Sequence, residues 1–111
     1  MDDGGGALRV VLMTAPDADT GRRIARALVD ERLIACANVL PGVTSIYRWQ
    51  GAVEEAAEVL VVMKTPAALV PRLFERAAAL HPYEVPELLA LPVGHGLPAY
   101  CRWVMEETDG A

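Results

Sequence analysis

Residues 11 to 27, VLMTAPDADTGRRIARA, recur in altered form as residues 61 to 77, VVMKTPAALVPRLFERA. Each copy runs from a short apolar segment through a proline into a segment whose apolar side chains have helical spacing. A strand followed by a helix, repeated once along the chain, predicts two βαβ units packed side by side. The residues that the two copies share are Val11, Met13, Pro16, Ala18, Arg22, Arg26 and Ala27.

The segment between the two copies has the composition of a long β-hairpin. Residues 35 to 48, ACANVLPGVTSIYR, are largely β-branched or aromatic, and Pro41-Gly42 in their middle favours a bulge or bend. Trp49-Gln50-Gly51 suits a tight reversal, after which residues 53 to 64 read as a second long strand. Two βαβ units joined by a hairpin give a ferredoxin-like α+β sandwich, a four-stranded antiparallel sheet with both helices on one face.

The rest of the chain completes this single domain, which is expected over residues 8 to 108, with residues 1 to 7 as a disordered tail. Pro82 is expected to end the second helix, and the prolines near the last strand suggest an edge position. The remaining expected elements are a strand over 8–14, a helix over 21–33 capped by Asp17 or Asp19, a helix from Thr65-Pro66, a strand over 86–93, and a short helix from Leu97 to Glu107.

This fold leaves sheet surface without a partner in its own chain. Two helices cover one face only, and strands of some twelve to fifteen residues overhang a small domain with unpaired edges. We expect a second and a third copy of the chain to pair with them in a closed ring, because open strand addition would polymerise.

Composition excludes several classes of partner. The net charge is −5, from ten basic and fifteen acidic side chains, with no basic run able to neutralise several phosphates, so nucleic acid is not expected. No apolar run is long enough to span a bilayer, so we expect no membrane contact and a cytoplasmic location. Cys36 and Cys101 form no C-x-x-C pattern and are expected as small buried side chains rather than as a disulfide or zinc site.

One stretch combines several chemically active side chains, namely LHPYEVPELLALPV over residues 80 to 93. One interpretation is structural: His81 ends a helix and bonds its last carbonyls. The other is functional, because an imidazole beside Glu84 and Glu87 is a workable ligand set for Zn(II) or Cu(II). Both interpretations stay open from the residues alone.

Several motifs together resemble the CutA family of divalent-cation tolerance proteins. They are TAPD near the start, ACANVLPGVTSIYRWQG in the middle, VVMKT after it and LHPYEVPELLALPV near the end, and the similarity covers residues 8 to about 105. The resemblance implies a ferredoxin-like homotrimer, a link to copper and other divalent metals, and no catalytic reaction. Family members with a proposed copper site have cysteine at the position of Met13 and histidines at those of Leu80 and His81. The implied metal residues here are therefore His81 and Met13, beside Glu84 and Glu87, and weak binding is expected because Leu80 cannot ligate a metal.

Two other functions and several residue roles remain to be distinguished. A PII-like trimeric sensor would bind a small anionic effector between subunits, but the tight turn at Trp49-Gln50-Gly51 replaces the long loop of those proteins. A Cys36 nucleophile with His81 as base would make an enzyme, yet no third orienting group is visible. Tyr47 and Trp49 suit a subunit contact or a ligand-stacking platform.

Glu58 and Lys64 are expected to pair with other neighbours, for example with Glu87.

Overall fold

The expected ferredoxin-like sandwich is confirmed by the computed structural model, which describes residues 2–111; Met1, the first residue of the expected tail, lies outside the described residues. The four strands form one antiparallel sheet in the order β2-β3-β1-β4. Its elements in chain order are β1 (Leu8–Ala15), α1 (Ala18–Asp30), β2 (Cys36–Trp49), β3 (Ala52–Pro66), α2 (Val70–Leu80), β4 (Leu89–Pro92) and α3 (Pro98–Glu107).

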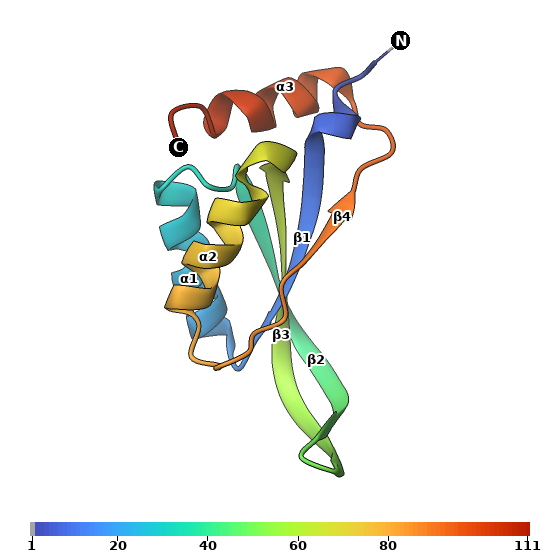
Figure 1. Ribbon diagram of the computed structural model, residues 1–111, viewed down its shortest axis with the longest axis vertical. Coiled ribbons are helices and arrows are strands. Elements are labelled where there is room, and N and C mark those ends of the chain that lie inside the picture. Colours follow the sequence, from blue (N-terminus) through green and yellow to red (C-terminus); the bar gives the residue numbers. More distant parts are fainter. Residues whose placement is uncertain (1) are drawn as a thin grey trace.

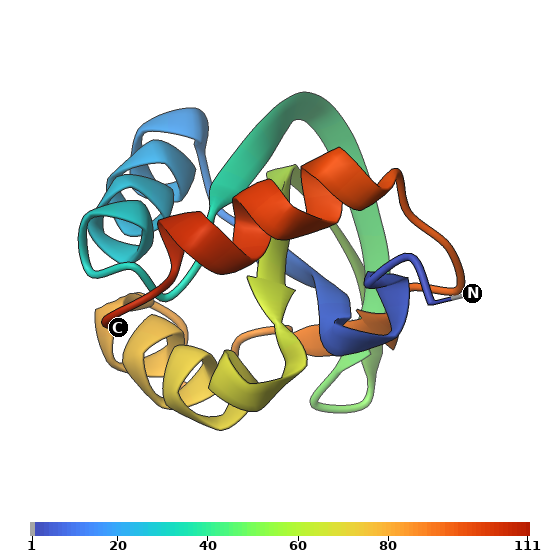
Figure 2. The same ribbon diagram turned by 90° about the horizontal axis from the view of Figure 1, so that it is seen from above.

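The helices α1 and α2 lie side by side on one face of the sheet, and α3 crosses the end of the sheet that is remote from the hairpin (Figures 1 and 2). The hairpin of β2 and β3 projects past the body, so the molecule is elongated, measuring 48 × 26 × 23 Å (Figure 1). The two repeated sequence segments occupy β1-α1 and β3-α2, as expected.

Helix α1 begins earlier and ends earlier than the expected span of 21–33. Asp17 caps it, since its carboxylate accepts a hydrogen bond of 2.7 Å from the Thr20 backbone N–H. The helix ends at Asp30 because Arg32 takes a left-handed conformation, with φ of 60°, and turns the chain back. Gly21 lets the helix approach closely, because a Cβ there would lie 3.0 Å from a methyl group of Val59.

Helix α2 begins after a 3-10 turn, Ala67–Leu69, and has Pro71 in its first turn, where a missing backbone N–H costs nothing. It ends at Leu80, as the position of Pro82 predicted. Strand β4 is shorter than the expected 86–93, since only Leu89–Pro92 pair with β1. Within the described chain β4 has no second neighbour, which confirms the edge position.

The core lies between the sheet and the helices α1 and α2. Alternate residues of β1 and β3 point into it, so that Val11, Met13, Val61 and Met63 are fully buried. The helices contribute Ile24, Leu28 and Leu73, which are fully buried as well. A smaller cluster beneath α3 is formed by Leu8, Ala35, Cys101 and Val104.

The other face of the sheet, here called the open face, is apolar but lacks a helical cover. The alternate residues lie opposite one another across the strands, so that Leu12 faces Leu89 on β4 and Val62 on β3, while Leu60 faces Leu40 on β2. Leu89 is 55% exposed and Leu40 is 42% exposed. An apolar strip across all four strands is therefore left open to solvent in a single copy.

The hairpin has the kink and the turn that the sequence predicted. Leu40 pairs with Leu60 and Val43 with Glu58, so two residues, Pro41 and Gly42, oppose one on β3 in a β-bulge. At the tip Gln50 and Gly51 both have positive φ, 49° and 84°, as a two-residue hairpin turn requires.

The N-terminal residues differ from the expected disordered tail. Gly5–Ala7 form a 3-10 turn, and Gly5 is buried. Asp3 forms hydrogen bonds to the loop that precedes α3. Residues 2–7 are therefore packed against the body, through contacts more than ninety positions apart in the sequence.

Candidate functional site

His81 lies at the end of α2, where the loop to β4 passes the end of β1. Its Nε2 is 2.8 Å from the carbonyl oxygen of Thr14, and its Nδ1 is 3.1 Å from the backbone nitrogen of Tyr83. A carbonyl only accepts and a backbone N–H only donates, so Nε2 carries the ring proton and Nδ1 is the acceptor. Both ring nitrogens are used, and the side chain is buried. The structural interpretation of His81 thus has geometric support, although its partner is β1 rather than the last carbonyls of its own helix.

Tyr83 connects this histidine to a buried carboxylate on β3. Its hydroxyl donates to Glu58 Oε2 at 2.6 Å, and its ring centroid lies 4.7 Å from that of His81. Burial, followed by the hydrogen bond to the Glu58 carboxylate, raises the pKa of Tyr83 from 10.0 to about 12. Thr14, His81, Tyr83 and Glu58 therefore form one connected polar group, called here the His81 network.

Glu58 is the member of this network whose role was missed. It is 8% exposed, and its side chain lies on the open face in step with Leu60. We expected Glu58 and Lys64 to pair with neighbours such as Glu87; the structure instead pairs Glu58 with Tyr83, and Lys64 with the Asn38 side chain. An acidic residue in phase with the apolar open-face residues of a strand was the signal available for Glu58.

The four predicted metal residues are not brought together in one chain. Met13 is fully buried in the core between the sheet and the helices, which removes its sulfur from the ligand set. Glu84 and Glu87 are exposed on the loop beyond His81. Over residues 2–111 no group of three His, Cys, Asp or Glu side chains is placed to hold a metal ion.

Tyr47 and Trp49 lie on the hairpin, on the same side as Glu58, because Val43 opposite Glu58 is in step with them. Tyr47 is 41% exposed and Trp49 51% exposed. The hairpin therefore presents exposed aromatic surface on the side of the sheet to which Glu58 of the His81 network belongs.

Cys36 and His81 do not form a catalytic pair. The Cys36 Sγ lies 3.3 Å from the Tyr100 hydroxyl, at the α3 end of the sheet, whereas His81 bonds Thr14 at the other end of β1. The hydrogen bond with Cys36, followed by burial, raises the pKa of Tyr100 to about 12. Cys101 is buried as expected, while Cys36 is only partly buried, and both are free thiols.

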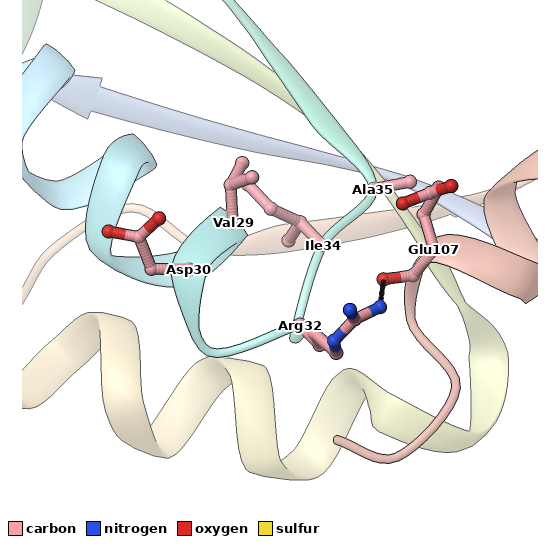
Figure 3. Close-up of a pocket in the computed structure, with 6 residues that line it drawn as sticks. All are labelled: Val29, Asp30, Arg32, Ile34, Ala35 and Glu107. Carbon is pink, nitrogen blue, oxygen red and sulfur yellow. Dashed lines mark hydrogen bonds between the residues drawn. The ribbon is translucent and has the colours of Figure 1, made fainter.

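A shallow hollow of about 240 Å³ lies elsewhere, where α1 ends and β2 begins (Figure 3). The Arg32 guanidinium spans it and donates to the backbone oxygen of Glu107 at 3.1 Å. None of the residues predicted for a site lines it; the lining residues are Val29, Asp30, Arg32, Ile34, Ala35 and Glu107. This hollow is lined by residues of both α1 and α3, and it is separate from the His81 network.

No helix among the described residues combines the length and the apolar character needed to cross a membrane.

Comparison with known proteins gives a consistent result. Residues 9–107 match the family described as CutA1 divalent ion tolerance protein. The divalent-cation tolerance protein CutA of Thermus thermophilus is 54% identical over 99 residues, which are 89% of this chain and 96% of that protein. Protein CutA of Mus musculus is 46% identical over 94% of this chain, which spans only 59% of the mouse protein.

Solved structures agree with these sequence matches. CutA from Xylella fastidiosa superimposes with a TM-score of 0.91 at 43% identity, over 93% of this chain and 99% of that one. Other similar proteins are named for different compartments, a periplasmic one from Archaeoglobus fulgidus and a chloroplastic one from Arabidopsis thaliana.

Proposed function

The chain belongs to the CutA1 divalent ion tolerance protein family, and from this premise we propose that it acts as a cytoplasmic homotrimer that binds divalent cations weakly and catalyses no reaction. The observation that carries the proposal is the open face. Its strip of leucine and valine side chains crosses all four strands, and burying apolar surface contributes about 25 cal/mol per Å². A second copy of the same chain is the partner whose surface is matched to it, and closure in a ring leaves no free edge.

The hairpin supports the same assembly. Residues 52 to 58 of β3 extend beyond the last residue that pairs with β1, and they carry exposed apolar side chains with no cover in their own chain. Ile46 and Val53 are each 64% exposed near the tip. In the proposed trimer this arm lies against a neighbouring copy, and Tyr47 and Trp49 contribute to that contact.

Metal binding is proposed in a weaker form than a dedicated copper site. Met13 is in the core and Leu80 offers no donor atom, while both nitrogens of His81 are already hydrogen-bonded. Cu(II) or Zn(II) would be held by the exposed carboxylates of Glu84 and Glu87, and would gain His81 only by displacing the Tyr83 N–H from Nδ1. Such a donor set predicts weak binding that a neighbouring copy can strengthen.

Three measurements test this function. Light scattering at micromolar concentration should give three times the chain mass of 11.9 kDa, and a monomer mass would refute the assembly. Calorimetric titration with Cu(II) and Zn(II) should show weak binding that is reduced by Glu84→Gln with Glu87→Gln. His81→Ala separates the two interpretations of the histidine, since unchanged affinity assigns it a purely structural role. Titration with nucleotides tests the PII-like alternative, which requires tighter binding of the anion than of the metal.

A further inference from the structure

The N-terminal residues 2–7 lie outside the part of the chain that matches the family, which starts at residue 9. They pack against the loop of residues 94–96 and the start of α3 (Figure 2). The segment has the sequence Asp-Asp-Gly-Gly-Gly-Ala, so its contacts come from two carboxylates and from the glycine backbone.

Asp3 is the central contact of this segment. Its Oδ1 accepts from the Gly5 backbone N–H at 2.9 Å, while its Oδ2 lies 3.2 Å from the Gly96 nitrogen and 3.2 Å from His95 Nδ1. The two backbone N–H groups, with a smaller contribution from His95, lower the pKa of Asp3. Asp2 differs, because its carboxylate accepts only from the Gly4 N–H within the segment. Among residues 2–111, the side-chain hydrogen bonds from this segment to the loop are those of Asp3.

The glycines of both partners fit closely over one buried side chain, Cys101. A Cβ on Gly96 would lie 2.5 Å from the Cys101 Sγ, and a Cβ on Gly4 would lie 3.0 Å from the Cys101 Cβ. Gly5 is confined as well, since its Cβ would meet the Gly96 nitrogen at 3.1 Å. Cys101 is only 3% exposed beneath this layer. The segment and the loop thus form a cover whose backbone touches the side chain below.

We propose that residues 2–7 form a clasp over α3 that controls access to the Cys101 thiol. Asp3 holds the clasp closed. In the closed state two contacts of Asp3, with the Gly96 N–H and with His95 Nδ1, hold the segment against the loop, and the third, with the Gly5 N–H, shapes the segment itself. Opening needs no unfolding of the sheet, because the segment contributes no strand pairing. Opening is therefore a local event that removes Gly4 from the Cys101 side chain and frees the loop that carries Gly96, while the sheet stays intact.

Thiol labelling tests the clasp directly. In the full chain with Cys36→Ser, which leaves Cys101 as the only thiol, the rate of reaction with DTNB at neutral pH reports opening. The parent should react about a hundredfold or more slower than the same chain in urea, and Asp3→Ala should speed the reaction about tenfold or more. Asp2→Ala is the matched control and should leave the rate unchanged.

A second readout keeps the test decisive if Asp3→Ala alters the fold. Asp3→Asn retains one carbonyl acceptor and should give an intermediate labelling rate, with faster hydrogen exchange at the Gly96 amide and unchanged exchange in β1 and β3. Equal labelling rates in the parent and Asp3→Ala would overturn the proposal. So would a parent thiol that reacts as fast as in the unfolded chain, or faster exchange throughout the sheet in both Asp3 variants.

Discussion

The two faces of the sheet both carry apolar residues, but these residues differ in how far they are buried. On the face that α1 and α2 cover, Met13 and Met63 are completely buried, whereas on the open face Leu89 and Leu40 remain about half exposed. The covered face is completed by helices close in sequence to the strands they pack on. The open face has no such segment, so its apolar residues indicate a contact that one chain cannot make. The same side-chain chemistry thus specifies a core on one face and, as we propose, an assembly surface on the other.

The largest expected effect comes from a charge on the open face. Leu89→Asp places a carboxylate in the apolar strip opposite Leu12, so covering this face would bury an unpaired charge. We expect the assembly to dissociate to monomers that keep the fold, as measured by light scattering and circular dichroism. Val29→Asp, at an exposed position on α1, is the control and should leave the mass unchanged. A trimer that survives Leu89→Asp contradicts the assignment of this face.

A cavity on the covered face should weaken the fold itself. Leu28 on α1 is fully buried in the core, and Leu28→Ala is expected to lower the free energy of unfolding by about 2–5 kcal/mol. Chemical denaturation measures this loss, best in the monomeric Leu89→Asp background, where assembly does not contribute. The neighbouring Val29→Ala should change it by less than about 0.5 kcal/mol. Equal losses at both positions would show that the covered side is not tightly packed.

The hydrogen bond between Tyr83 and Glu58 connects the loop after α2 to β3, near the end of β1. Tyr83→Phe leaves the buried Glu58 carboxylate without its donor and should cost about 1–2 kcal/mol in chemical denaturation. Tyr100→Phe removes only a hydroxyl–thiol contact with Cys36 and should cost less. If the two variants are equally stable, the His81 network adds nothing to the join between loop and sheet.

Alkaline titration examines the same bond without a substitution. The folded-state pKa of Tyr83, about 12, lies above its ordinary value of 10.0, so the bond stabilises the fold fully below about pH 10. That contribution should be lost as the pH rises through about 12, and the stability of Tyr83→Phe should fall less over this interval. Parallel curves for the two proteins would assign the alkaline loss to other groups.

The smallest expected effect concerns the start of the helical cover. Asp17→Ala removes the cap of α1 and should lower the melting temperature slightly, while Asp19→Ala, which loses an exposed pair with Arg22, should change it less. Because Thr20 lowers the pKa of Asp17, the cap should contribute at pH above its ordinary value of 3.8 and be lost below it. If Asp17→Ala leaves the melting temperature unchanged, the stability of α1 comes from its packing against the sheet and not from its cap.

Much of this arrangement was predictable because it depends on neighbours in the sequence. The turn at Gln50-Gly51, the bulge at Pro41-Gly42 and the end of α2 before Pro82 follow from the local preferences of glycine and proline. The contacts of the His81 network were not predictable in this way. His81 meets Thr14 across 67 positions and Tyr83 meets Glu58 across 25, and no local preference encodes such partners. The packing of residues 2–7 was missed for the same reason, since Asp3 finds its partners at residues 95 and 96.

The bulge in β2 also shifts the phase of the side chains along the strand. Side chains along a strand alternate with a period of two residues, and one extra residue moves that alternation by half a period. Before the bulge the even-numbered positions Cys36, Asn38 and Leu40 share the open face; after it the odd-numbered Tyr47 and Trp49 do. Deleting Gly42 would restore the original phase and turn both aromatic rings to the opposite side of the arm. The one extra residue in the bulge thus determines which side chains the distal half of the hairpin presents to another molecule.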